Sequence, residues 1–341
     1  MEQSDYNKMR KNFIREQETL AELGESQLLK RLANFCPPNQ LKDDTALLST
    51  LGEKILINTD LLVEEIHFSK LTTSPQDVGW RAIAANLSDL AASGVDKIIG
   101  ITVGLIAHPD TPWEWVEGVY EGINAALTTF GGKVIGGDCS QGKEKVLAIT
   151  AIGTLGPLHL HRSNAIPGDY LVTSGPHGLS RLGLSILLSE PLLAKTPLTN
   201  RLKEKAIKAH KHPQPRLNAL RYLQNCKPEG IEWRAAGTDS SDGLLTAVKN
   251  LCESSCCSAI LNPKALPKDV EWPIGSQWDT WCLEGGEDFE LVLSLPPSWA
   301  KAWLKALPQS YLIGVVEAGK PIVKWADSRE EIIERSSFKH F

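Results

Sequence analysis

Long hydrophobic runs are missing from this chain. No stretch of about eighteen apolar residues occurs, so the sequence predicts no membrane-spanning helix. Residues 1–17 are polar and mixed in charge, without the apolar core of a secretory signal. We therefore expect a cytoplasmic protein with no membrane partner.

An excess of basic residues is also missing. Lys and Arg number 36 against 41 Asp and Glu, which gives a formal net charge of −5. A nucleic-acid-binding surface needs clustered positive charge, so this balance argues against a nucleic acid partner. The apolar content of 42% and the charged content of 23% are those of an ordinary globular protein, and 341 residues are enough for two domains.

Disulfide and zinc signatures are absent as well. The chain has 7 Cys, and an odd number in a chain of this length argues against a disulfide framework. Cys252, Cys256 and Cys257 form the spacing C-x₃-C-C, which is not a standard zinc pattern and has no His beside it. We expect reduced thiols.

A complete phosphate-binding loop is the last absence. Residues 137–144 nearly match G-x₄-G-K-[ST], but the last position is Glu144 instead of the hydroxyl that holds Mg²⁺. Such a loop must also open a helix, whereas residues 145–153 have the apolar pattern of a strand. If the protein uses ATP, it does so through another architecture.

Acidic residues beside small residues are what the chain does contain. They occur at expected strand ends and turns, in residues 42–44, 58–60, 64–65, 86–89, 136–138, 239–243 and 285–288. Gly and Ser let the backbone approach a ligand closely, and carboxylates suit hard cations such as Mg²⁺. The pattern predicts a nucleotide or another phosphate that is held through metal ions.

Strands and helices alternate along the chain, so the sequence predicts an α/β or α+β class. We expect strands at 45–51, 54–58, 97–105, 134–135, 146–155, 170–173, 235–239, 290–295 and 311–316. We expect helices at 26–35, 74–87, 112–130 and 241–251, and a short one that begins near Ser88-Asp89. Ser74, Pro75 and Asp77 mark a helix start by their capping chemistry.

Motifs in a fixed order connect the acidic stretches to a known family. The strongest are Asn86-Leu-Ser-Asp-Leu-Ala-Ala92 and Gly285-Gly-Glu-Asp-Phe-Glu-Leu291, supported by Thr59-Asp60, Gly136-Gly-Asp138 and Asp239-Ser-Ser-Asp-Gly-Leu244. Through this set the chain resembles, from about residue 23 to its last residue, the thiamine-monophosphate kinases of the aminoimidazole ribonucleotide synthetase-like superfamily.

The resemblance implies a two-domain α/β fold and an activity. Residues 1–22 would be an extension, 23–160 an N-terminal domain that binds ATP and Mg²⁺ and pairs across a homodimer, and 161–341 a C-terminal α/β domain. The implied reaction is ATP-dependent phosphorylation of thiamine monophosphate to thiamine diphosphate, by in-line transfer with several Mg²⁺ ions. No catalytic general base is expected, because the acceptor is an anionic phosphate oxygen.

The resemblance also implies roles for individual residues. It places metal ligands at Asp44, Thr59, Asp60, Asp89, Asp138, Asp239 and Asp242. It places ATP contacts at Tyr120, Gly137, Asp138, Arg162 and Ser241, and thiamine substrate contacts at His67 and Glu287. Ordinary structural roles compete with these: the Ser-Asp pairs could cap helices, Asp138 could be a turn residue, His67 could be a partly buried His with its hydrogen bonds satisfied, and Tyr120 and Arg162 could be packing residues.

Some positions depart from the family's usual pattern. Lys42 replaces a Gly before the Asp pair, Cys139 replaces a Thr, and Glu65 replaces a Gly before His67. The family's C-terminal aromatic contact is not matched. Because the Asp set is intact, we expect activity. Two alternatives stay open: an ATP-using synthetase of the same superfamily, and a catalytically silent nucleotide-binding protein.

Overall fold

The computed structural model describes residues 27, 30, 45–49 and 52–334. The chain divides into two compact units, residues 1–42 with 338–341, and residues 43–337. Of the first unit only Gln27 and Lys30 are described, and both are helical. The rest of the helix expected at 26–35, and the positions of Lys42 and Asp44, lie outside the described residues.

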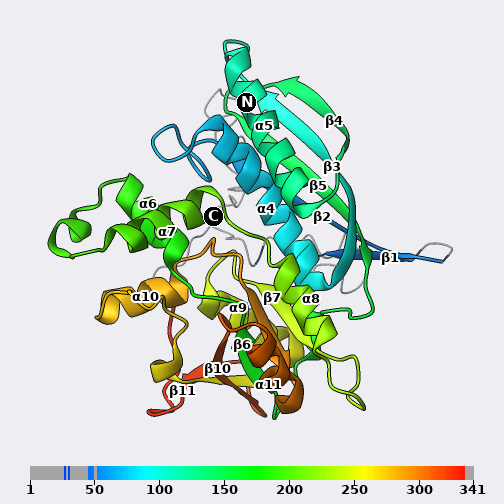
Figure 1. Cartoon of the computed structure of the whole chain (residues 1–341), viewed down its shortest axis with the longest axis vertical. Helices are drawn as coiled ribbons and strands as arrows, with labels where there is room; N and C mark the ends of the chain where they lie inside the picture. The colour runs from blue at the N-terminus through cyan, green and yellow to red at the C-terminus, as the bar shows by residue number, and fades with distance from the viewer. Residues whose placement is uncertain (1–26, 28–29, 31–44, 50–51, 335–341) are drawn as a thin grey trace, which may run out of the picture. The chain divides into compact units, whose positions relative to one another are not determined.

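A five-stranded sheet with two helices on one face forms the first half of the large unit (Figure 1). Its strand order is β1-β2-β5-β3-β4, and only the β3–β4 pair among these neighbours is parallel. The elements are β1 (Ala46–Ser49), β2 (Lys54–Val63), α4 (Pro75–Ser93), β3 (Val95–Ala107), α5 (Trp113–Phe130), β4 (Val134–Gln141) and β5 (Val146–Leu155).

Side chains alternate between the two faces of this sheet, because strand residues point to opposite faces in turn. Leu56 on β2, Ile149 on β5 and Val103 on β3 are fully buried in the core with α4 and α5. The residues between them on the same strands are only half-buried or exposed. The sheet therefore has one covered face and one open face.

Helix α4 is longer than the sequence suggested. Ser74 and Asp77 form a reciprocal capping box at its start, and it continues to Gly94, whose left-handed backbone (φ 93°) ends it. The expectation of a second helix starting near Ser88-Asp89 is wrong, because both residues lie inside α4. Neither residue therefore caps a helix, so capping is excluded as the role of Asp89.

A six-stranded sheet forms the second half, in the order β11-β8-β10-β6-β9-β7. The strands are β6 (Tyr170–Thr173), β7 (Ala236–Asp239), β8 (Ser258–Leu261), β9 (Leu291–Leu295), β10 (Tyr311–Glu317) and β11 (Val323–Trp325). The α-helices are α6 (Leu179–Leu187), α7 (Asn200–Lys211), α8 (Leu217–Asn225), α9 (Leu244–Ser255), α10 (Ser276–Glu284) and α11 (Pro297–Ala306). Short 3₁₀ turns are η3 (Arg162–Asn164), η4 (Pro191–Lys195) and η5 (Pro263–Ala265).

Two element boundaries differ from expectation in ways that affect the candidate site. The helix expected from residue 241 begins at Leu244, with Gly243 as its N-cap, so Ser241 and Asp242 do not cap it. The strand expected at 134–135 extends through Gln141, so Asp138 is a strand residue and not a turn residue. Helix capping is therefore excluded as the role of Ser241 and Asp242, and a turn is excluded as the role of Asp138.

Two findings bear on the class of protein. The described helices include none that is long and apolar enough to cross a membrane. Among the cysteines that the structure describes, Cys139, Cys226, Cys252, Cys256, Cys257 and Cys282 are free thiols.

Candidate active site

Three carboxylates from distant parts of the sequence come together beside α4. Asp60 lies on β2, Asp239 ends β7, and Asp242 lies in the turn before α9. Burial, and then the negative charges of Asp239 and Asp242, raise the pKa of Asp60 from its ordinary 3.8 to about 6. Charges affect each other in this way only when they are near neighbours. We call Asp60, Asp239 and Asp242 the acidic cluster.

Asp89 joins the acidic cluster through Asn58. Asn58 and Asp60 lie two residues apart on β2 and therefore share a face. The Asn58 side-chain amide donates to the carboxylate of Asp89 at 2.9 Å and to the Asn86 side chain at 3.2 Å. The buried Oδ1 of Asn58 has no hydrogen-bond partner in the described residues. The site thus contains a carboxylate and an unused amide oxygen beside the acidic cluster.

Asp239 is held in one orientation by two hydroxyl groups. The buried Ser88 hydroxyl of α4 donates to its Oδ2 at 2.6 Å, and the Ser241 hydroxyl donates to its Oδ1 at 2.9 Å. Arg162 lies beside the same strand, where its Nε donates to the Thr238 hydroxyl at 3.2 Å. Ser241 therefore lies next to the acidic cluster, whereas Arg162 contacts the residue that precedes Asp239 on β7.

His67 and Glu287 meet around a buried arginine. Arg81 of α4 donates to the Glu287 carboxylate at 2.5 Å and to the backbone carbonyl of His67 at 3.2 Å. The Nδ1 of His67 accepts from the backbone N–H of Val63 at 3.0 Å, so the neutral ring carries its proton on Nε2. The structure thus brings together the two residues expected to face the thiamine substrate.

Arg81 is a residue that sequence reasoning passed over. It lies 3% exposed within the otherwise mostly apolar helical segment 78–84. A charge that is buried in this way needs a partner, so its position on the buried face was a usable signal. Its partner lies 206 positions away in sequence, which the sequence alone does not identify.

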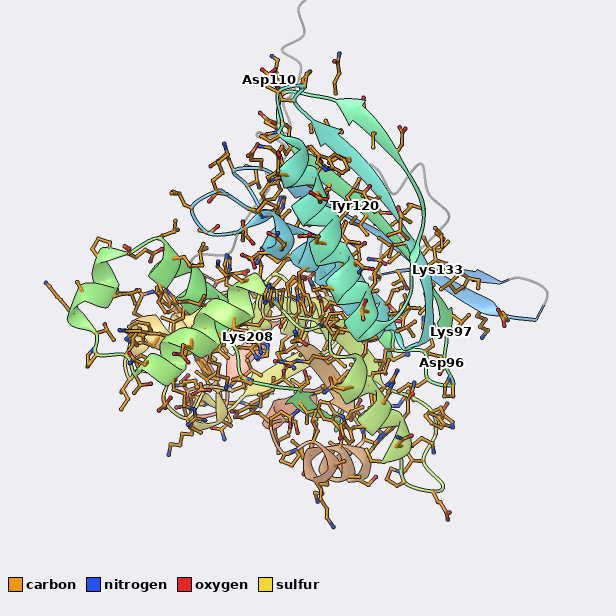
Figure 2. All side chains as sticks on the ribbon, turned by 45° about the horizontal axis from the view of Figure 1, so that its top comes forward. Asp96, Lys97, Asp110, Tyr120, Lys133 and Lys208 are labelled. Carbon is orange, nitrogen blue, oxygen red and sulfur yellow. The ribbon has the colours of Figure 1, made fainter. Side chains whose placement is uncertain are left out.

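Tyr120, Gly137 and Asp138 all lie at the other edge of the sheet, with Tyr120 on its covered face. Burial, and then the neighbouring Cys139 of β4, raise the pKa of Tyr120 above its ordinary value. Figure 2 shows Tyr120 on α5, at the side of the helix next to the strands. Gly137 lies against β3, where an added Cβ would be 2.2 Å from the carbonyl oxygen of Val103. This strand therefore requires Gly at residue 137 for packing reasons alone.

Strand pairing separates Asp138 from the acidic cluster within one chain. Asp60 pairs with Ile149, Ile149 with Val103 and Val103 with Gly137. Gly137 thus lies three strand spacings from Asp60, about 14 Å. Its neighbour Asp138 points to the opposite, open face. The described chain does not bring Asp138 to the other carboxylates.

Thr59 also points away from the acidic cluster. Its side chain is exposed on the open face and shares a hydrogen bond of 2.8 Å with the Thr150 hydroxyl of β5. Its hydroxyl therefore does not face Asp60. Asp44, the remaining expected metal ligand, lies outside the described residues.

The donor set beside α4 fits Mg²⁺, although it is not a complete cage. Within the residues that the structure describes, no three His, Cys, Asp or Glu side chains are placed to hold a metal ion by themselves. Mg²⁺ in phosphoryl-transfer sites is usually held by one or two carboxylates, with the remaining positions filled by water and substrate phosphates. Asp60, Asp89, Asp239 and Asp242 supply carboxylate oxygens of the kind that such an ion prefers, and burial together with the charges of Asp239 and Asp242 raises the pKa of Asp60.

Comparisons with known proteins identify the family of the chain. The family model "AIR synthase related protein, N-terminal domain" matches residues 42–155, and "AIR synthase related protein, C-terminal domain" matches residues 167–326. The chain is 58% identical over 328 residues to a thiamine-monophosphate kinase of Prochlorococcus marinus, covering 95% of this chain and 98% of that protein. It is 42% identical to one from Synechococcus elongatus, with the same coverage.

A solved structure gives the same result. "AaThiL complexed with AMPPCP and TMP" matches with a TM-score of 0.81 and 27% identity, covering 95% of this chain and 99% of that chain. The two-domain α/β fold expected from the sequence is thus confirmed. The chain belongs to the thiamine-monophosphate kinase family, within the AIR synthase related proteins.

Proposed function

We propose that this protein transfers the γ-phosphoryl group of ATP to thiamine monophosphate, giving ADP and thiamine diphosphate. The observation that carries this proposal is the acidic cluster, in which carboxylates from distant parts of the sequence lie close enough to raise the pKa of Asp60, an arrangement that suits metal-bound phosphates. Relatives that match nearly the whole chain carry the name of this kinase, and the solved neighbour is described with AMPPCP and TMP.

Mg²⁺ would be held by Asp60, Asp89, Asp239 and Asp242. When bound, several such ions would supply charge neutralisation between two anionic reactants, which is the main requirement of phosphoryl transfer. The chain's own part is positioning. The two serine hydroxyls fix Asp239, and Arg162 adds a permanent cation beside β7.

The transfer we propose is an in-line displacement. A phosphate oxygen of thiamine monophosphate forms the new bond to the γ-phosphorus, and the bond from that phosphorus to the bridging oxygen of ADP breaks. The attacking oxygen is already anionic near neutral pH, so no residue has to remove a proton. We assign His67 and Glu287 to the acceptor side, where Arg81 contacts both of them.

A homodimer is part of the proposal, and the open face of the first sheet supports it. On the three central strands the middle of this face carries Ile57, Thr59, Leu61, Ala148, Thr150, Ile152, Thr102, Gly104 and Ile106, none of them charged, and the charged Lys97 lies at one end, opposite Thr154. Leu61 is 56% and Ile106 38% exposed. An extended uncharged face of this kind is typical of an interface, and we assign it to a second copy of this chain.

The dimer would also explain the separation of Asp138. Its side chain lies on the open face, so a copy that packs there comes into its neighbourhood. We therefore propose that Asp138 of one subunit completes the phosphate site of the other. The domain boundary near residue 160, and the metal and ATP roles of the individual residues, stay predictions.

The test is turnover by the purified chain with ATP, MgCl₂ and thiamine monophosphate. Chromatography should show thiamine diphosphate and ADP in equal amounts, and EDTA should stop the reaction. Release of ADP only with a carboxylate or amide acceptor would favour a synthetase. Binding of ATP without turnover of any acceptor would favour a silent nucleotide-binding protein.

A further inference from the structure

Arg81 joins three segments that are far apart in the sequence. It is 3% exposed, and its terminal nitrogens donate to the carbonyl of His210 at 2.6 Å, the carbonyl of His67 at 3.2 Å and the carboxylate of Glu287 at 2.5 Å. These partners lie after β2, near the end of α7 and before β9. One side chain of α4 thus connects all three segments.

Glu287 depends on Arg81 for its neutralisation. The nearest other basic group is His210, whose Nδ1 is 3.9 Å from the Glu287 carboxylate. Burial, and then the charge of Arg81, lower the pKa of His210 to about 4, so its ring is uncharged at neutral pH. Among the described residues, the ion pair of Glu287 at neutral pH is therefore the one with Arg81.

A second contact from α4 reaches the acidic cluster. Ser88 follows Arg81 by seven residues, two helical turns, and so lies on the same face of the helix. Its hydroxyl donates to Asp239. The helix therefore holds the acceptor-side residue Glu287 at one point and the cluster residue Asp239 at another.

The two held residues are also joined to each other. The backbone N–H of Glu287 donates to the carbonyl of Ser241 at 2.5 Å, and the Ser241 hydroxyl donates to Asp239. Arg81, Glu287, Ser241, Asp239 and Ser88 thus form a closed ring of hydrogen bonds that starts and ends on α4. A ring of this kind fixes the distance between the acceptor side and the acidic cluster.

The loop that carries Glu287 needs such support. Glu287 has a φ of 55° and Phe289 a φ of 51°, in the left-handed region that non-glycine residues avoid, and Gly286 between the helix and Glu287 has a φ of 68°. Strained backbone of this kind persists only where surrounding contacts hold it, and it is frequent at functional sites.

We propose that Arg81 is a positioning residue for the phosphoryl acceptor: it holds Glu287 at a set distance from Asp239, while Ser88 holds Asp239 from the same helix. This rests on the proposed function, in which Glu287 faces thiamine monophosphate. Arg81 itself touches neither reactant. Its loss should impair binding of the acceptor and leave binding of ATP largely intact.

Arg81→Lys is the informative variant, since it keeps the charge but lacks the planar fork that reaches several acceptors at once. We expect KM for thiamine monophosphate to rise about tenfold, the effect of losing one charge-assisted hydrogen bond, with KM for ATP nearly unchanged. Ser88→Ala is the matched variant at the other end of the ring. It should shift the Mg²⁺ dependence and leave KM for the acceptor nearly unchanged. Equal effects of Arg81→Lys on both substrates would overturn the proposal.

Hydrogen–deuterium exchange of the free protein separates this proposal from the proposed function. Arg81→Lys should speed exchange in residues 285–290, whereas Arg329→Lys, which alters an exposed ion pair with Glu317, should not. If wild-type protein fails to phosphorylate thiamine monophosphate while this exchange result holds, the proposed function fails and the holding role of Arg81 stands. Unchanged exchange in residues 285–290 would show that Arg81 does not hold the loop. If Arg81→Lys does not fold, Glu287→Gln removes the same ion pair from the exposed side and should give the same exchange result.

Discussion

The acidic cluster and strand β4 are two regions built in opposite ways. Beside α4, Asp89 and Asp239 accept hydrogen bonds from Asn58, Ser88 and Ser241. On β4, every residue from Val134 to Gln141 is exposed, and the residues that the structure describes provide no hydrogen bond or ion pair for the Asp138 side chain. Both regions carry the motifs of the same family, yet only the first is organised within one chain.

This difference indicates how the site is assembled. Side chains that are fixed before a ligand arrives cost little further ordering when it binds, so the acidic cluster is prepared to receive metal-bound phosphate. Strand β4 has no such support, and its edge is unpaired on the side away from β3 in the described chain. We expect it to gain its partners from a second subunit.

The largest effect should come from pairing variants of the two regions. Asp89→Asn and Asp138→Asn should each lower turnover about 1,000-fold, because each removes a ligand of the phosphate site. Co-expressed, they should recover about a quarter of the wild-type rate, because random pairing makes about half of the dimers mixed and each mixed dimer restores one of two sites. Turnover assays of differently tagged, co-purified chains measure this.

Two controls make the pairing experiment decisive. Asp89→Asn with Asp239→Asn places both lesions in the same region, so this mixture should stay inactive. Asp110→Asn, at a side chain that is 91% exposed in a distant loop, should keep the wild-type rate. No recovery with Asp138→Asn would mean that Asp138 acts within its own subunit or outside the site.

Removal of one charge from the acidic cluster should abolish turnover and increase the stability of the metal-free protein. The folded-state pKa of Asp60 is raised from 3.8 to about 6. The ionised side chain therefore destabilises the metal-free fold above pH 6. The protonated side chain, which predominates below pH 4, does not destabilise it. Asp60→Asn should therefore stabilise the metal-free protein at pH 8 by an amount on the order of 1–3 kcal/mol, while abolishing turnover.

Thermal unfolding with EDTA at pH 8 and at pH 4 measures this effect. The gain should be full at pH 8 and should be small near pH 4, because Asp60 is then protonated in the folded state and about half protonated in the unfolded state. MgCl₂ at pH 8 should stabilise the wild type more than the variant. A variant less stable than the wild type at pH 8 would mean that the Asp60 charge is already compensated.

Local chemistry predicted much of the fold. Ser74, Pro75 and Asp77 marked the start of α4 correctly, and Trp113–Phe130 matched the expected helix within one residue. The Ser88-Asp89 pair misled, since the same residue types that cap helices here point from the middle of α4 to partners on other elements. Helix-capping propensity describes hydrogen bonds to residues near in sequence, whereas Ser88 and Asp89 form hydrogen bonds with residues that are distant in sequence.

The candidate site was predictable in composition but not in geometry. The Asp-rich motifs identified Asp60, Asp89, Asp239 and Asp242, which the structure brings together. The face on which Asp138 lies depends on the length of β4 and its register with β3, and neither can be read from Gly-Gly-Asp alone. A shift of one residue would have reversed the face.

A smaller effect separates two adjacent glycines of β4. A Cβ added to Gly137 would lie 2.2 Å from the Val103 carbonyl oxygen, whereas one added to Gly136 meets nothing closer than 3.9 Å. Gly137→Ala should therefore displace β4 and cost about 1–3 kcal/mol of stability, and Gly136→Ala should cost almost nothing. Chemical denaturation of the two variants compares them, and equal stabilities would mean that β4 adjusts freely.

The smallest expected effect concerns the turn before His67, which belongs to the region beside α4 and not to strand β4. Glu65 occupies a position with a φ of 64°, which explains why the family usually has Gly there. Left-handed backbone costs a non-glycine residue roughly 1–2 kcal/mol, and Gly loses roughly 0.5–1 kcal/mol through its greater unfolded-state freedom. Glu65→Gly should thus stabilise the fold by about 0.5–1 kcal/mol. Lys70→Gly, at an exposed neighbour whose φ is not positive, should instead destabilise it. If the denaturation midpoints fall equally for both variants, the left-handed backbone at Glu65 carries no free-energy cost. The turn backbone would then not help to hold His67 in place.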